Sequence, residues 1–163
     1  MDIVESANLK YYGISPIEIE IIYSVLSSLF YVNEDTIESS GETSVLEIYF
    51  PVAYGQSFFD TLGRQKWPKL KGMLKEMKHR RGSKGLKVTL SFTGKMHDTT
   101  EVTTEVTFSL TNLENYAFEM AIEKLEYMVD IILSQIKNSQ NLEKVFYTYD
   151  QTSSKWIASK TKF

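Results

Sequence analysis

The 163-residue chain contains no cysteine and only two histidines. The lack of cysteine excludes disulfides, thiolate zinc sites and cysteine nucleophiles, and it is typical of intracellular proteins. The two histidines, His79 and His97, are too far apart for the H-x-x-x-H or H-E-x-x-H spacing that brings two imidazoles to one metal ion. We therefore expect neither a metal site nor a metal cofactor.

The motifs of common enzyme classes are also missing. The sequence has no G-x-S-x-G nucleophile motif, no Walker motif and no dinucleotide-binding glycine loop. The short glycine loop at residues 82–85 precedes an expected strand, whereas phosphate-binding loops precede a helix. Neighbouring carboxylates such as Glu101 and Glu105 fall on faces that we expect to be solvated. We therefore predict no catalytic residue and no cofactor, and enzymatic activity stays an open alternative to binding.

Long hydrophobic runs are absent too. No apolar run approaches the ~20 residues that span a bilayer, and the acidic start Met1–Glu5 is unlike a signal peptide. We expect a cytoplasmic protein without a membrane partner. Apolar residues make up 42% of the chain and charged residues 24%, with no internal repeat and no shift in composition. These values predict one soluble domain, residues 1–163, that buries a core without disulfides.

The clearest structural pattern covers residues Leu113–Ile136, where apolar side chains recur at three- and four-residue spacing. This spacing predicts a single amphipathic helix. Thr111 and Glu114 have the spacing of a capping box at its start. The expected apolar stripe is Phe118, Ile122, Leu125, Val129, Ile132 and Ile136, and the expected acidic stripe is Glu119, Glu123, Glu126 and Asp130.

Two strands are expected in the segment before the long helix at 113–136. Apolar and polar residues alternate over Leu86–Phe92 and over Val102–Leu110, which predicts an antiparallel hairpin with one solvated face. The side chains that we expect to point inward are Val88, Leu90, Val106 and Phe108. The outward side chains are then Thr89, Ser91, Glu105 and Thr107.

The remaining elements follow from capping and turn signals. A second capping box, Ser15 with Glu18, predicts a helix from Pro16 to about Tyr31, and residues 33–43 have the composition of an acidic, flexible loop. Further expected elements are a strand at 45–50, a short helix at 54–62 that Gly63 ends, a helix from Pro68 to Arg81, and strands at 145–149 and 156–159.

In chain order, the core elements are strand, helix, strand, strand, helix, strand. That order matches the split βαβ pattern of ferredoxin-like folds, in which an antiparallel sheet carries two helices on one face. We therefore predict an α+β fold with a ferredoxin-like sheet and two packed helices, plus an extra N-terminal helix and a short C-terminal strand. The fold alone predicts no function.

The formal net charge of −3 conceals an uneven distribution. Residues 64–87 hold ten basic residues and one acidic residue, a net charge of +9, so the rest of the chain carries −12. Phosphates attract such clusters through Coulomb forces and counterion release. We predict non-catalytic binding of nucleic acid or another polyanion through its phosphate backbone. The expected contact residues are Lys71, Lys75, Lys78, Arg80, Arg81 and Lys84.

Other interpretations of these features stay open. The basic stripe of Lys71, Lys75 and Lys78 can be a solvated helix face that the acidic stripe of the long helix neutralises. The same basic surface can dock onto an acidic protein or onto a second copy of the chain, which would give a symmetric homodimer. The aromatic residues that crowd the first 60 positions can form the core, a small-molecule pocket or a dimer surface. The aromatic signature of RNA-recognition domains is absent from the expected strands.

Overall fold

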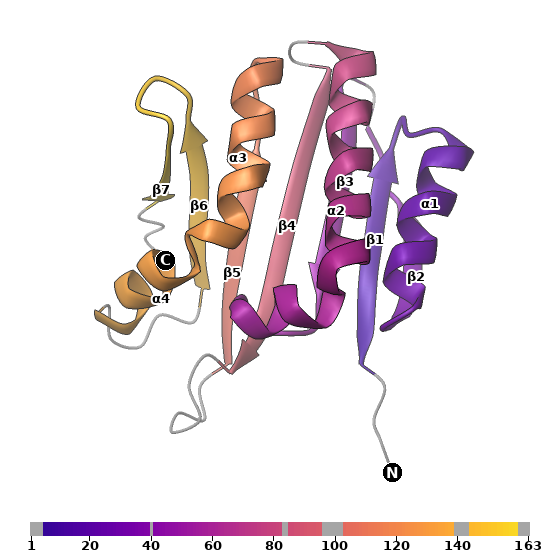
Figure 1. The fold of residues 1–163 in the computed structure, drawn as a ribbon. Helices are drawn as coiled ribbons and strands as arrows, with labels where there is room; N and C mark the ends of the chain where they lie inside the picture. The colour runs from indigo at the N-terminus through magenta and orange to yellow at the C-terminus, as the bar shows by residue number, and fades with distance from the viewer. Residues whose placement is uncertain (1–4, 40, 83–84, 96–102, 139–143, 160–163) are drawn as a thin grey trace.

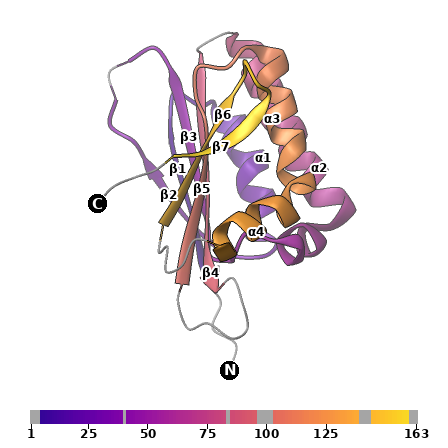
Figure 2. The same ribbon diagram turned by 90° about the vertical axis from the view of Figure 1, so that its left-hand side faces the viewer.

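The helices lie on one face of a seven-stranded sheet, and no helix in the described part of the chain covers the other face (Figure 1, Figure 2). The computed structural model describes residues 5–39, 41–82, 85–95, 103–138 and 144–159. The strands are β1 (Ser6–Tyr12), β2 (Tyr31–Thr36), β3 (Ser44–Phe50), β4 (Leu86–Lys95), β5 (Thr103–Leu110), β6 (Lys144–Asp150) and β7 (Lys155–Ser159). The helices are α1 (Pro16–Ser27), α2 (Gln56–Arg81), α3 (Asn115–Tyr127) and α4 (Val129–Asn138).

Parallel and antiparallel pairs alternate across the sheet, whose strand order is β2-β1-β3-β4-β5-β6-β7. β1 and β2, β3 and β4, and β5 and β6 pair in parallel, each through a helical connection. The other neighbours pair antiparallel. The predicted α+β class is confirmed, but this is not the four-stranded ferredoxin-like sheet. Element order alone did not distinguish this seven-stranded sheet from a ferredoxin-like one. A strand–helix–strand segment can place its second strand directly beside the first, or one strand further away.

The crossovers β3-α2-β4 and β5-α3-α4-β6 have opposite hands. Both advance in the same direction across the sheet with their helices on the same face, but β5 and β6 run antiparallel to β3 and β4. In Figure 1 the β5-to-β6 crossover is the left-handed one, whereas about 98% of such connections are right-handed. A right-handed path would lead to the side of β5 that β4 already occupies. The left-handed path therefore keeps β4 and β5 together in the middle of the sheet.

Helix α2 runs from Gln56 to Arg81 and contains Pro68. The prediction of two helices, with Gly63 ending the first and Pro68 starting the second, is therefore wrong. Figure 1 shows that α2 changes direction near its start, as a proline inside a helix favours. Aromatic contacts stabilise this bend, because the Trp67 ring centroid lies 6.1 Å from that of Phe58 and 5.2 Å from that of Phe59.

The helix expected over Leu113–Ile136 is divided at Met128, where φ is −102° and ψ is 10°. The Tyr54 hydroxyl donates a hydrogen bond to the Leu125 carbonyl just before the break. This contact gives a partner to one of the carbonyls that a helix end leaves without an intrahelical bond. The apolar stripe continues across the break, and all six of its residues are buried, as predicted.

Two strands were not predicted. β1 and β2 pair with each other, α1 ends at Ser27 rather than near Tyr31, and the loop expected at 33–43 begins inside β2. β2 lies at the edge of the sheet and is mostly exposed, so it lacks an apolar alternation. Its Asn, Glu and Asp residues are also uncommon in strands.

The two expected capping boxes differ in outcome. At the start of α1, the Ser15 hydroxyl accepts from the Glu18 amide, and the Glu18 carboxylate accepts from the Ser15 amide. The capping box of Thr111 and Glu114 is wrong. α3 has Glu114 itself as its N-cap residue, and the Thr111 hydroxyl pairs with that of Ser109 at 2.8 Å.

The register of the hairpin is confirmed. β4 and β5 pair antiparallel, and Val88, Leu90, Val106 and Phe108 are fully buried on the helix side. Their neighbours along each strand point to the uncovered face because side chains alternate in a strand. None of the helices in the described residues is long and apolar enough to cross a membrane.

Candidate ligand-binding site

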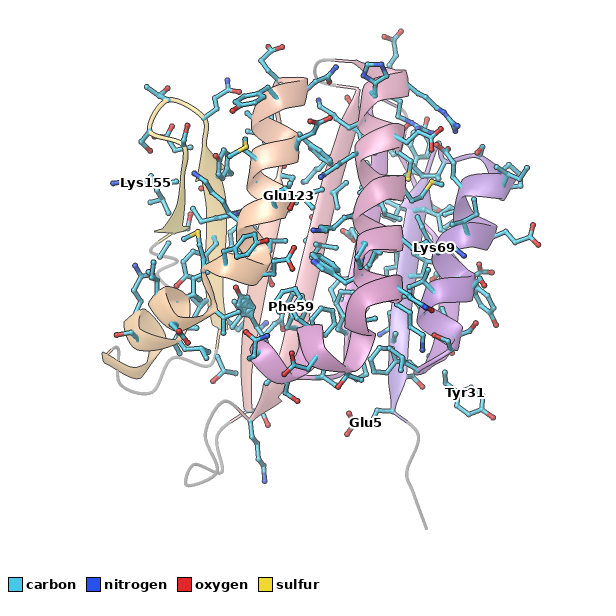
Figure 3. All side chains as sticks on the ribbon, in the orientation of Figure 1. Glu5, Tyr31, Phe59, Lys69, Glu123 and Lys155 are labelled. Carbon is cyan, nitrogen blue, oxygen red and sulfur yellow. The ribbon has the colours of Figure 1, made fainter. Side chains whose placement is uncertain are left out.

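Helix α3 lies beside α2 and pairs with two lysines of its basic stripe. Glu123 lies on the side of α3 that faces α2 (Figure 3). Lys71 Nζ is 3.1 Å from a Glu123 oxygen and 2.5 Å from a Glu126 oxygen, and Lys75 also pairs with Glu123. Burial lowers the pKa of Lys71, but its hydrogen bonds to Glu126 and Glu123 outweigh burial, so the net effect raises it. Both lysines therefore have carboxylate partners inside the molecule.

Lys78 is buried, with 1% of its surface exposed. Its Nζ donates to the Gly82 carbonyl at 3.1 Å, at the C-terminal end of α2, and lies 5.8 Å from the centre of the Phe118 ring. Burial lowers the pKa of Lys78, although the nearby Glu114 carboxylate opposes this shift. The Lys78 side chain therefore caps the C-terminal end of α2 and does not face solvent.

Arg80 and Arg81 reach towards α1. They lie 3.4 Å and 2.6 Å from the carboxylate of Glu18, and Arg80 is also 2.5 Å from Glu76. Lys84 lies outside the described residues. The structure thus brings the other five predicted contact residues together on α2, but it pairs or buries them within the molecule. Their contact with nucleic acid stays a hypothesis.

Four of the hydroxyl side chains on the uncovered face of β4 and β5 adjoin one another. β4 contributes Thr89 and Ser91, and β5 contributes Thr107 and Ser109. The register places Thr89 opposite Ser109 and Ser91 opposite Thr107, so the four side chains form two adjoining rows. The hydroxyl oxygens of Ser91 and Thr107 lie 3.0 Å apart. We call these four residues the hydroxyl block.

Three of these hydroxyl residues are buried although no helix covers their face (Figure 2). Ser91 is 1% exposed, and Thr107 and Ser109 are each 7% exposed. The register continues their row to larger side chains, Tyr49 on β3 and Phe146 on β6. The short hydroxyl residues therefore form the floor of a hollow, and the longer neighbours form its rim.

This hollow has a volume of about 360 Å³. Its rim consists of two carboxylates, two lysines and two aromatic rings, which are Glu47, Glu105, Lys87, Lys144, Tyr49 and Phe146. The formal charges of the rim cancel. The arrangement combines hydrogen-bond donors, acceptors and apolar ring faces around a polar floor.

The carboxylates of the rim are only weakly engaged. The Tyr49 hydroxyl donates to Glu47 at 3.3 Å, and the Thr107 hydroxyl donates to Glu105 at 3.4 Å, both long for hydrogen bonds between oxygens. Burial, followed by the charge and hydrogen bond of Glu47 and the charge of Glu105, raises the pKa of Tyr49. The phenol is therefore protonated at neutral pH, and both carboxylates keep lone pairs that a ligand can use.

The sequence predicted that these hydroxyl residues point outward to a solvated face; the direction is right, but three of them are buried, and the pattern did not identify them as a site. The available signal was the alternation of short hydroxyl residues on two strands that pair with each other. The rim was not predictable, because the ferredoxin-like arrangement does not place β3 beside β4 with β6 on the far side of β5.

No match to the chain was found among protein-family models, and none of significance among curated proteins or solved structures. Within the described ranges, no group of three or more histidine, aspartate and glutamate side chains is placed to hold a metal ion. His97 lies outside those ranges.

Proposed function

We propose that the protein is a non-catalytic binding protein that holds a small, uncharged, polyhydroxylated ligand of the size of a mono- or disaccharide. The ligand lies in the hollow on the uncovered face of the sheet. The observation that carries this proposal is the burial of hydroxyl side chains on a face without a covering layer. A hydroxyl group has one donor site and two acceptor sites, so each retains capacity beyond its contacts within the floor.

The rim has the chemistry that a sugar requires. Each sugar hydroxyl both donates and accepts hydrogen bonds, and the carboxylates supply acceptors while the lysines and the phenol supply donors. The rings of Tyr49 and Phe146 give apolar surfaces for the C–H groups of a sugar ring. The volume of about 360 Å³ lies in the range of roughly 300–1,000 Å³ that is usual for small-ligand sites.

The charge balance of the rim favours an uncharged ligand. Glu47 and Glu105 would repel a phosphate or carboxylate group, and Lys87 and Lys144 would repel an ammonium group. Because each side of the floor carries one lysine and one glutamate, a single strong charge on the ligand gains little net Coulomb energy in the hollow.

A titration series tests the proposal. Protein-observed NMR and calorimetry would be run with a panel of neutral mono- and disaccharides, with glucose 6-phosphate and glycine as charged and zwitterionic probes. We expect saturable binding of at least one neutral sugar, with shift changes at β4 and β5, and weaker binding of its phosphorylated form. Absence of saturation across the neutral panel would overturn the proposal.

A pair of variants on one strand locates the site. Thr107→Leu raises the floor of the hollow and should weaken sugar binding at least tenfold. Thr103→Leu makes the same change on the same face of β5, at an exposed position that does not line the hollow, and should bind as the wild type does. Thermal unfolding of both variants checks that the fold is kept. Equal affinities of the two variants would show that the ligand binds elsewhere.

Binding of nucleic acid through α2, or a homodimer formed through that surface, is the alternative function. Lys69 supports it, because this residue is exposed on α2 (Figure 3) and forms no ion pair with a described residue. The hollow lies on the opposite face of the sheet from α2, so variants of one surface leave the other unchanged.

A further inference from the structure

The β2 end of the sheet combines a free strand edge with a trough beside it. β2 is the last strand in the order, and no described strand pairs with its outer edge. The amide and carbonyl groups along such an edge can pair with another extended chain. Tyr31, the first residue of β2, is 69% exposed and projects from this edge (Figure 3).

The trough runs along α1. Two hollows of about 410 Å³ and 360 Å³ meet at Tyr23, which lines both. Tyr23 shares a stripe of α1 with Pro16, Glu20 and Ser27, because these residues recur at three- and four-residue spacing. The apolar lining of the two hollows includes Tyr11, Ile14, Ile19, Leu29, Phe30 and Val32.

Acidic side chains border the trough. Glu20 on α1 and Glu34 on β2 both line the larger hollow, and Asp35 follows on the other face of β2. Among the described residues, no lysine or arginine forms an ion pair with any of the three. Pairing of two β2 edges from two copies would bring these carboxylates together, and like charges oppose such an edge-to-edge contact.

We propose that this edge binds an extended, basic segment of another protein, which adds to the sheet as a further strand beside β2. In a strand, residues i and i+2 lie on the same face about 6.6 Å apart. Apolar side chains at alternate positions of the segment would enter the hollow that Leu29, Phe30 and Val32 line. A lysine or arginine further along the same face of the segment would reach the hollow that Glu20 and Glu34 line. This site shares no residue with the hollow on the uncovered face.

Labelled peptides test the site by fluorescence anisotropy. The probe is an eight-residue peptide with blocked ends, in which two leucines and then two lysines take the alternate positions and threonine fills the positions between them. One control has glutamate in place of every lysine, and another carries N-methyl groups on alternate amides, which removes the hydrogen-bonding edge. We expect the lysine peptide to bind with saturation and both controls to bind at least tenfold more weakly. Absence of saturation, or equal binding of the three peptides, would overturn the proposal.

Charge variants distinguish the effect of a carboxylate at the β2 edge from the effect of the net charge of the protein. Glu34→Lys should weaken binding of the lysine peptide at least tenfold, and Tyr23→Ser should weaken it severalfold. Glu119→Lys makes the same charge change at an exposed position on α3 and should leave binding unchanged. An equal effect of Glu119→Lys would mean that only net charge matters. A wild-type dimer that Glu34→Lys dissociates would assign the edge to a second copy. Either result rejects the proposed partner.

Discussion

The guanidinium of Arg81 and the carboxylate of Glu18 form a two-pronged contact between residues that are 63 positions apart, with Nη2–Oε1 at 2.6 Å and Nη1–Oε2 at 3.0 Å. Glu18 also caps α1 through Ser15. Arg81 is the last residue of α2, and its Nε donates to Ser44 at the start of β3. One ion pair therefore joins two helices and a strand.

Replacement of Glu18 should be costly. Glu18→Gln keeps the shape of the side chain but leaves the largely buried Arg81 without its charge partner, and removal of one partner from a buried pair costs about 3 kcal/mol or more. Urea unfolding at neutral pH measures this loss in the free energy of unfolding. Glu20→Gln, on the exposed side of the same helix, is the matched control and should change stability little.

The same pair predicts a dependence on pH. The hydrogen bond from Arg81 is the largest cause that lowers the pKa of Glu18 from 4.5 to about 2, against the opposing effect of burial. Because the pKa in the folded state lies below that in the unfolded state, the stabilisation is complete above the unfolded-state pKa and disappears as the pH falls towards 2. The stability gap between wild type and Glu18→Gln should shrink across this window. A gap that stays constant on acidification would contradict the ion pair.

The Tyr54 hydroxyl should stabilise the junction of α3 and α4. Tyr54→Phe leaves the Leu125 carbonyl without this donor, and a buried polar group without a partner costs about 1–3 kcal/mol. We expect a loss in this range, together with faster amide exchange at the start of α4. Tyr116→Phe removes a hydroxyl from a side chain that is 74% exposed and should change neither quantity.

The apolar stripe of α3 and α4 should dominate the stability of this half of the molecule. Leu125 is 1% exposed, and Leu125→Ala should lower the free energy of unfolding by about 2–5 kcal/mol through lost burial and a new cavity. Ile131 lies on the outer side of α4 and is 55% exposed. A loss for Ile131→Ala as large as that for Leu125→Ala would mean that a partner covers the outer side.

Local periodicity predicted the elements whose apolar residues lie on one face only. The stripe from Phe118 to Ile136 and the alternation in β4 and β5 are of this kind, because an apolar face leaves its period in the sequence. β2 has no such period, since most of its side chains are exposed. At Pro68 and Met128 the local pattern gave the wrong helix boundary. The helix continues through Pro68 and breaks at Met128, because tertiary contacts decided the outcome at both residues.

The pairing of distant elements was less predictable. Lys71 lies beside Glu123 because α2 and α3 are neighbours. No local sequence pattern predicts which helices are neighbours. The hydroxyl block was visible as an outward-facing set, but its rim depends on the order of four strands. Strand order is set by non-local contacts and by the left-handed crossover that keeps β4 beside β5.

The basic stripe of α2 gives the last prediction. Because Lys71 and Lys75 pair with α3 and Lys78 is buried, we expect weak retention on heparin and a shallow dependence of duplex DNA affinity on salt. The log–log slope changes by roughly −0.9 for each phosphate that a cation neutralises. A wild-type slope that corresponds to five or six phosphates would instead support nucleic-acid binding through this stripe.

Removal of the Glu123 carboxylate, which pairs with Lys71 and Lys75, tests why the affinity for DNA is expected to be weak. Glu123→Gln releases Lys75 and weakens the hold on Lys71, so it should steepen the salt slope by roughly one to two units. Glu119→Gln removes the same charge from the exposed side of α3 and releases neither lysine. If both variants raise affinity equally, the net charge of the molecule controls its affinity for DNA. If only Glu123→Gln does, the intramolecular ion pairs are what keep the basic stripe from phosphate.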